Sequence, residues 1–524
     1  MARLLSKEQV LITLFITVIV SISAIPSFFY IFRTPPNTYY PMVSNYVPDY
    51  YQYISHMKDG ADGKILMTFR SSPDNFQRKP VYLFYTLAGF FISKIGVDLF
   101  IGFFLIKIIF SFIKFMVIYY LLLKLFPKSS GLRILSFFFI LLSTPFYKLQ
   151  PLQIYYPTIT SIDSLIRVLF IPHDLAASAL LILAVVFFNH WLNVKGKIKD
   201  IFLSGIFFLL VIVANPAMFT VFGFYFGLAV FLYLLQKNSN YKKIFIGLLI
   251  IGVITTPVYF YYQLLFRTTL PFSLIFSNQK LINYNIRLKE FILISGPVFF
   301  LALFSIKKLF MKKDFLSTLL IVWAFMPLAL FQIFGKIFPI SHERIFETCF
   351  YIPFGILAAV SVYQLQKKYL KIIIIVLLVV FSIPYFYSSL KNQVNEFNGP
   401  YMNIYVPTST VEAFNWLDKH SKDESVVVAG FFSGNLLMAF SHNKIMFGHE
   451  SSAYRGKERL NETIKIYNIN TPSEEIKDIF NRENVSYVLF APDTVNYDQT
   501  NLSKIKNLKL VFSNAGNSVY YYKK

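Results

Sequence analysis

Asp49 is the residue whose type and position best suit chemistry. It follows Pro48 in a long polar segment between two apolar stretches, where a pattern typical of an amphipathic helix begins. The apolar residues of that pattern share one helical face: Tyr50, Tyr53, Ile54 and Met57. A carboxylate at such a helix start can act as a general base toward a hydroxyl group, or it can simply cap the helix, because Asp is a preferred cap residue. The residues alone leave both interpretations open.

Cationic side chains near the ends of apolar stretches are candidates for binding a phosphate group. Arg is favoured over Lys, since the planar guanidinium presents paired donors to phosphate oxygens. The candidates are Arg78, Lys79, Arg167, His173, Arg267, Arg287, His342 and Arg344. Arg344 also lies one helical turn before Glu347, so these two residues could form a structural ion pair instead.

His173 and Asp174 open another apolar stretch, where they could bind a metal, act as a base or cap a helix. Capping is the favoured interpretation for Asp174, because an acidic residue in the first turn interacts well with the helix dipole. No set of His, Asp and Glu residues in the sequence has convincing metal-ligand spacing. The sequence therefore predicts no cofactor and leaves the requirement for a divalent metal open.

The elements that must position these residues are membrane helices. Hydrophobic residues make up 56% of the chain and charged residues only 15%, so a water-exposed surface could not cover it. The net charge of +23 does not indicate nucleic-acid binding, because the Lys and Arg residues fall in short clusters between apolar stretches. We expect an α-helical polytopic protein whose surroundings are the lipid bilayer.

About eleven apolar segments are predicted to cross the bilayer as transmembrane helices. They are residues 10–32, 99–123, 133–148, 174–194, 201–215, 217–235, 244–265, 291–306, 315–334, 345–363 and 372–388. Residues 81–95 form a shorter apolar segment that is broken by Gly89, Lys94 and the following Gly96, which suits an interfacial helix. The basic clusters then fall on alternate connections, as the positive-inside rule requires. This topology places the N-terminus in the cytoplasm, and the first long loop, residues 33–97, outside the cytoplasmic membrane together with the C-terminal region.

A small α/β domain is predicted after the last apolar segment. The chain then divides into a membrane domain, residues 1–396, and an extracytoplasmic domain, residues 397–524, in which helical and strand patterns alternate. Residues 433–435 are expected to form a turn, with too few glycines for a nucleotide-binding loop. Residues 448–450 are interpreted as a turn that contains a satisfied histidine. Tyr454 and Arg455 are candidate contacts for an acceptor glycan.

The loop acid, the segment Lys79-Pro80-Val81-Tyr82, the many spans and the C-terminal domain together resemble the C-superfamily (GT-C) of membrane glycosyltransferases. The resemblance implies transfer of a hexose or pentose from a polyprenyl-phosphate donor to a glycan, lipid or protein acceptor outside the membrane. It implies that Asp49 deprotonates the acceptor and that Arg344, at the start of a late span, contacts the donor phosphate. The further residues expected at the phosphate are Arg78, Lys79, His342 and Arg167, and those around the acceptor or behind it are His56, Asp59, His173 and Asp174.

A transporter, flippase or envelope-assembly protein without catalysis is the alternative interpretation. Such proteins tend to carry ionisable residues in the middle of spans and to show repeated halves. Lys107 and Lys114 are the main charges within a predicted span, and we find no internal repeat. Because the other ionisable groups gather at the outer boundary, the sequence favours interfacial chemistry.

Overall fold

The chain forms two compact units, which we describe separately. The computed structural model describes residues 6–43, 47–146, 163–193, 195–236, 241–279, 286–337, 341–395, 404–449, 453–494, 502 and 505–523. The membrane unit contains Met1–Ile25, Lys107–Leu264 and Phe276–Asn392, and the loop–sheet unit contains Pro26–Ile106, Leu265–Ile275 and Gln393–Lys524. The first helix, α1 (Lys7–Phe32), and α4 (Leu99–Leu125) contribute residues to both units.

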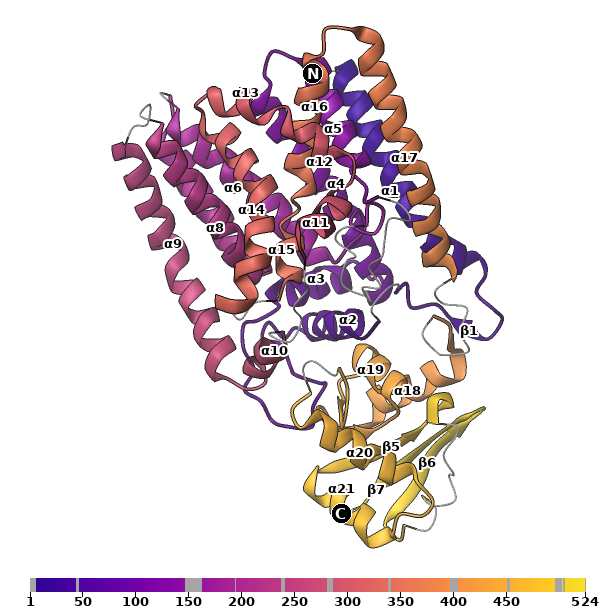
Figure 1. The fold of residues 1–524 in the computed structure, drawn as a ribbon. Coiled ribbons are helices and arrows are strands. Elements are labelled where there is room, and N and C mark those ends of the chain that lie inside the picture. Colours follow the sequence, from indigo (N-terminus) through magenta and orange to yellow (C-terminus); the bar gives the residue numbers. More distant parts are fainter. Residues whose placement is uncertain are drawn as a thin grey trace. The chain divides into compact units, whose positions relative to one another are not determined.

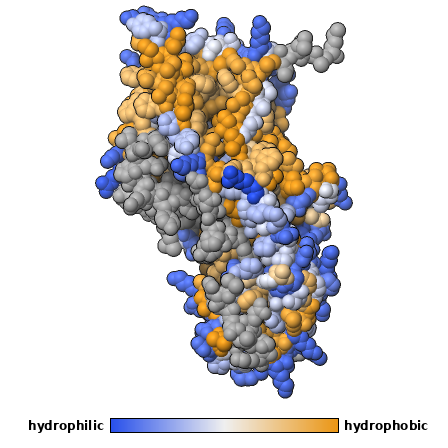
Figure 2. Space-filling view, turned by 90° about the vertical axis from the view of Figure 1, so that its right-hand side faces the viewer, coloured by the Kyte–Doolittle hydropathy of each residue, from blue (hydrophilic) through white to orange (hydrophobic). Residues whose placement is uncertain are grey.

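The membrane unit is a bundle of apolar helices (Figure 1). Besides parts of α1 and α4, its helices are α5 (Ser130–Leu142), α6 (Pro172–Leu192), α7 (Ile198–Ala214), α8 (Pro216–Leu235), α9 (Tyr241–Thr268), α10 (Phe272–Gln279), α11 (Leu288–Ser295), α12 (Val298–Leu303), α13 (Ile306–Met311), α14 (Phe315–Ile337), α15 (Glu343–Glu347), α16 (Tyr351–Gln364) and α17 (Lys368–Asn395). Of these, α9, α10 and α17 end or begin in the loop–sheet unit. Figure 2 shows apolar side chains gathered over much of this unit, as lipid-facing helices require.

The expected membrane class is confirmed, and the described helices refine the number of spans. Seven of them are long and apolar enough to cross a bilayer, and an eighth crossing results if α11 and the following helices, bent by 101°, form one span. The other predicted spans are shorter helices: α5, α7 and α16 have 13, 17 and 14 residues. At about 1.5 Å per residue, 14 residues cover only about 21 Å of a hydrocarbon core about 30 Å thick.

The short helix α16 is closely packed inside the bundle. Along most of its length α16 is buried, and it lies against α5. Gly355 makes this contact possible, because a Cβ there would lie 2.7 Å from the Cα of Ile140. Small residues at helix contacts are typical of membrane bundles, where backbones approach closely. By contrast, α17 exposes apolar residues such as Ile372, Val376 and Val380.

The loop–sheet unit is built on a five-stranded sheet of order β4-β3-β5-β7-β6. The strands are β3 (Val426–Val428), β4 (Lys444–Ile445), β5 (Val485–Phe490), β6 (Leu508–Asn514) and β7 (Asn517–Tyr522), and the accompanying helices are α18 (Thr408–His420), α19 (Phe431–Phe440), α20 (Gly456–Tyr467) and α21 (Ser473–Arg482). β3 runs parallel to β4 and β5, whereas β7 is antiparallel to its two neighbours. The predicted alternation of helices and strands is confirmed.

One local prediction in this unit is wrong. Residues 433–435 do not form a turn but lie within α19, buried on its inner side. The carboxylate of Asp493 accepts the backbone N–H groups of Phe432 and Ser433 and thereby caps the start of the helix. Because this cap comes from about sixty residues later in the chain, the local Ser-Gly-Asn pattern did not reveal it.

The first long loop contributes two helices, α2 (Val47–Ala61) and α3 (Leu83–Lys94), that interlock through glycines. A Cβ on Gly60 would lie 1.8 Å from the carbonyl oxygen of Thr86, and one on Gly89 would lie 1.9 Å from that of Met57. The two backbones are therefore in direct contact. With 12 residues, α3 is about 18 Å long, shorter than the hydrocarbon core of a bilayer, and its interfacial position stays a prediction.

The loop and the C-terminal sheet are joined by strand pairing and ion pairs. Strand β1 (Thr38–Tyr39) pairs with β2 (Val406–Pro407), and the backbone N–H of Ile445 in β4 donates to the carbonyl oxygen of Arg70. The buried Arg459 holds Asp74 at 2.6 Å. These links explain why the first loop belongs to the same compact unit as residues 404–523.

Candidate functional site

Asp49 lies in the first turn of α2, where its carboxylate meets a histidine from the C-terminal sheet domain. The Asp49 Oδ1 atom lies 2.5 Å from Nε2 of His449. The His449 side chain is 4% exposed, whereas that of Asp49 is 35% exposed. One side of the carboxylate is thus held by a buried ring while the group still reaches solvent, which suits a base that must meet a substrate.

The position of His449 depends on the tight approach of its segment to the first loop. Gly448 precedes it, and a Cβ there would lie 3.1 Å from the Cβ of Ser71. The sequence correctly indicated a satisfied histidine but not its partner, which lies 400 residues earlier. No local pattern reports such a pairing; the only signal was a Gly-His pair directly after a predicted strand.

A stripe of buried polar residues continues along α2 beyond Asp49. His56 is buried with its ring stacked 4.9 Å from that of Tyr82, and neither ring nitrogen has a hydrogen-bond partner within the described ranges. Burial, together with the nearby Arg70, lowers the pKa of His56 to about 3, so the ring is neutral. Because it lies inside the unit, His56 supports α2 and does not present a surface to an acceptor.

Asp59 forms a buried ion pair at the far end of the same stripe. Its Oδ1 lies 2.7 Å from Nη2 of Arg70, and both side chains are at most 1% exposed. The backbone N–H of Thr68 donates to the other carboxylate oxygen, and Arg70 also donates to the carbonyl oxygen of Ser55. Asp59, expected as an acceptor contact or a support, is therefore a support that fixes α2 to the following loop.

The four other predicted site residues of this unit are engaged in ion pairs, hydrogen bonds or aromatic packing. Arg78 lies 2.6 Å from Glu424, and Lys79 donates to Gln77. Arg455 pairs with Glu458 and Glu483, while the ring of Tyr454 packs on Phe76 and near Arg459. The Arg78 side chain is paired with Glu424 but is still 40% exposed, so it reaches solvent.

In the membrane unit, the side chain of Asn215 donates hydrogen bonds to two acidic residues from different helices. Its amide nitrogen lies 2.6 Å from Asp174 Oδ1 and 3.0 Å from Glu347 Oε2, and its oxygen caps α8 by accepting the N–H of Met218. Arg344 pairs with Glu347, which is the structural alternative that the sequence left open. His173 lies 3.4 Å from Asp174. The sequence gave no indication of Asn215, whose role depends on three distant segments.

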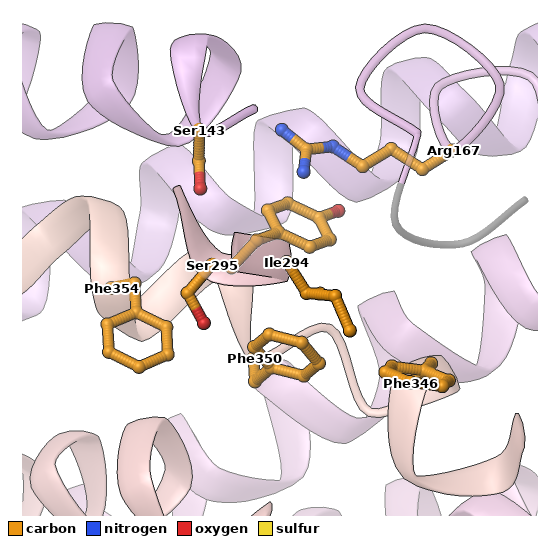
Figure 3. A pocket seen from close by; sticks show the side chains of 8 residues that line it. Ser143, Arg167, Ile294, Ser295, Phe346, Phe350 and Phe354 are labelled. Carbon is orange, nitrogen blue, oxygen red and sulfur yellow. The ribbon is translucent and has the colours of Figure 1, made fainter. Parts of the chain in front are cut away.

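Arg167 borders a small pocket in the membrane unit. Figure 3 shows the Arg167 side chain among the residues that line this pocket. Its guanidinium carbon lies 3.7 Å from the centroid of the Tyr351 ring. Lys114 reaches the same tyrosine ring from α4, at 5.6 Å. The pocket is lined by Ser143, Arg167, Ile294, Ser295, Phe346, Phe350, Tyr351 and Phe354.

The cationic side of this pocket has no directly paired acid in the described part of the chain. Neither Arg167 nor Lys114 forms a salt bridge there, although both are buried. Arg167 instead donates to the carbonyl oxygen of Ile140, and Asp163, four residues earlier in the chain, accepts from Tyr385 and Ser389. Two buried cations beside an aromatic ring suit an anionic group bound among apolar side chains. In the described ranges, no group of three or more His, Cys, Asp or Glu residues is arranged to hold a metal.

Comparisons with solved structures identify the fold. The chain aligns over 90% of its length with the apo oligosaccharyltransferase of Archaeoglobus fulgidus, covering 69% of that chain with 12% identity and a TM-score of 0.55. It aligns over 97% with ArnT from Cupriavidus metallidurans bound to undecaprenyl phosphate, covering 98% of that chain with 11% identity and a TM-score of 0.52. It also aligns over 97% with a mutant form of the arabinofuranosyltransferase AftD from Mycobacteria, covering 41% of that chain with 13% identity and a TM-score of 0.58.

No protein-family model and no curated protein matches the sequence. The structural matches therefore establish the fold, which is that of membrane glycosyltransferases of the GT-C type, as the resemblance in the sequence implied.

Proposed function

We propose that this integral membrane protein is a glycosyltransferase that moves a sugar from a polyprenyl-phosphate donor to an acceptor hydroxyl, with Asp49 as the general base. The observation that carries the proposal is the fold, which aligns along 97% of the chain with ArnT bound to undecaprenyl phosphate. A related archaeal oligosaccharyltransferase structure contains dolichol-phosphate, so two of the similar proteins bind lipid phosphates. Asp49 supports the assignment as an acid of the first loop that is one-third exposed.

The reaction proposed for Asp49 is inverting attack at the anomeric carbon. The acceptor oxygen forms a bond to that carbon, the bond from the carbon to the phosphate oxygen breaks, and the acceptor proton passes to the Asp49 carboxylate. The lipid phosphate leaves as an anion and needs cationic stabilisation. The reaction takes place outside the membrane if the positive-inside assignment holds, since that assignment puts the first loop on the outer side.

For the donor phosphate, the membrane unit offers Arg167 together with Lys114. Both cations lie close to the Tyr351 ring, and Arg167 also borders the pocket whose apolar side chains suit a lipid chain. Arg344 and His342 belong to the same unit and remain candidates, although Arg344 is already paired with Glu347. Arg78 and Lys79 of the loop–sheet unit are candidates for the same role.

Sugar transfer by purified protein in liposomes tests the function. With a synthetic polyprenyl-phosphate sugar as donor, wild-type protein should release lipid phosphate and glycosylate an acceptor, and Asp49→Asn should lower the rate by about 10²–10⁴-fold, as expected when a general base is lost. The variant should keep the thermal stability of the wild type. Full activity in Asp49→Asn would reject the base assignment, and movement of the lipid-linked sugar across the vesicle without transfer would favour the transporter alternative.

A further inference from the structure

We infer that His449 is a positioning residue for Asp49, so that the C-terminal sheet domain completes the reactive group of the first loop. The inference rests on the proposed function, in which Asp49 accepts the acceptor proton. Its physical basis is the contact of 2.5 Å between His449 Nε2 and Asp49 Oδ1. This contact occupies one carboxylate oxygen and leaves the other for the acceptor hydroxyl.

The environment of the ring shows that it is built into the fold. His449 is 4% exposed, and its backbone carbonyl accepts the N–H of Ala453. Just before it, β4 is fixed to the first loop by the bond from Ile445 to Arg70, and Gly448 lies against Ser71. These contacts fix the segment that carries His449 against the first loop. The imidazole is therefore held beside Asp49 by the backbone around it.

A free aspartate at this position would be a poorly oriented base. Asp49 lies in the first turn of α2, where unpaired backbone N–H groups attract a carboxylate and would stabilise it in a capping position. A hydrogen bond from His449 to Oδ1 competes with that arrangement. It holds the carboxylate plane in one orientation, which is how a buried partner usually prepares a reactive group.

The alternative is that the pair only fastens the sheet domain to α2. Other links already do this, among them the ion pairs Lys58–Asp418 and Lys64–Asp423. The second of these is a matched control, because it also links the first loop to the sheet domain and its Asp423 side chain is 51% exposed. A purely mechanical role predicts similar effects from the loss of either link, whereas positioning predicts an effect on turnover from His449 alone.

Kinetics of full-length variants in liposomes separate these roles. His449→Ala should lower kcat by about tenfold to a hundredfold, the range seen when a partner that orients a reactive group is removed, with little change in KM. His449→Gln, which can still donate to Oδ1, should recover a large part of the loss. Lys64→Gln should behave as wild type. Asp49→Asn combined with His449→Ala should be no slower than Asp49→Asn alone, because the two residues act as one unit.

The outcomes distinguish this inference from the proposed function. If Asp49→Asn loses activity while both His449 variants turn over as wild type, the positioning role is wrong and the base assignment stands. The positioning role is also wrong if the two substitutions lower kcat multiplicatively in the double variant. If wild-type protein transfers no sugar, or if Asp49→Asn is fully active, the base assignment and the positioning role are both rejected. Folding is checked by the melting temperature of each variant, and His449→Gln keeps the test valid should His449→Ala be unstable.

Discussion

Replacing Arg70 by Met should destabilise the loop–sheet unit far more than removing an exposed ion pair of similar geometry. Arg70 makes bonds of 2.7 Å to Asp59 and 2.5 Å to the carbonyl oxygen of Ser55. Without the guanidinium, the fully buried Asp59 carboxylate still accepts the N–H of Thr68. Among the described residues, it then has no cation within ion-pair distance. Leaving one charge of a buried pair unpaired typically costs about 3–5 kcal/mol.

The matched control is Lys64→Met. Lys64 and Asp423 also lie 2.7 Å apart in the loop–sheet unit, but their side chains are 22% and 51% exposed. Exposed pairs contribute about 0–1 kcal/mol, because water and salt screen them. Arg70→Met combined with Asp59→Asn should recover most of the lost stability, since no unpaired charge then remains inside the unit.

Pulse proteolysis of purified full-length protein in detergent, across a urea series, measures these free energies of unfolding. Cleavage is followed at sites within the sheet domain, so that the loop–sheet unit is reported. The reasoning is refuted if Arg70→Met loses no more stability than Lys64→Met. It is equally refuted if the double variant is as unstable as Arg70→Met, because the penalty would then not come from an unpaired charge.

Three further predictions follow from local geometry. Gly89→Ala should separate α2 from α3 and lower the melting temperature, whereas Gly223→Ala in α8, where a Cβ meets nothing within 4 Å, should be neutral or slightly stabilising. Burial would raise the pKa of Glu424, but bonds from Lys444 and Arg78 outweigh it and lower that pKa to about 2. Since this is below the unfolded value of about 4.3, the carboxylate contributes stability above about pH 4 that is lost as the pH falls toward 2, and Glu424→Gln should flatten melting temperature against pH in that window. Arg167→Met should weaken binding of polyprenyl phosphate measured by native mass spectrometry about tenfold or more, while Arg482→Met, which removes a cation from α21, should leave it unchanged.

The sequence predicted the elements well because hydrophobic periodicity is a local property. The amphipathic pattern after Pro48 appears as α2, and each of the eleven predicted apolar segments contains a helix. The lengths were less predictable, since the predicted span 345–363 is divided between α15 and the 14-residue α16. Residues 433–435 were mistaken for a turn because their cap, Asp493, lies far along the chain.

Of the residues at the candidate site, Asp49 was the one that the sequence predicted clearly. Asp49 stood out by residue type and by its place at a helix start. Its partner His449 and the bridging Asn215 did not, because each acquires its role from residues distant in sequence. Likewise, Asp59 and His56 were grouped with Asp49 as polar residues of one helix, but burial places them on its inner side. Which face of a helix is covered depends on packing that a sequence does not display.

The long separation between α2 and the strands that hold it has a consequence for biosynthesis. A chain made from the N-terminus presents residues 47–74 well before Arg459 and His449 exist, so Asp74 and Asp49 begin without the partners that later bind them. During that interval the first loop lacks β2 and β4 as neighbours as well. The Asp49 carboxylate therefore acquires its final orientation only when translation has passed the sheet domain, and a truncated product would carry Asp49 in an unassembled loop.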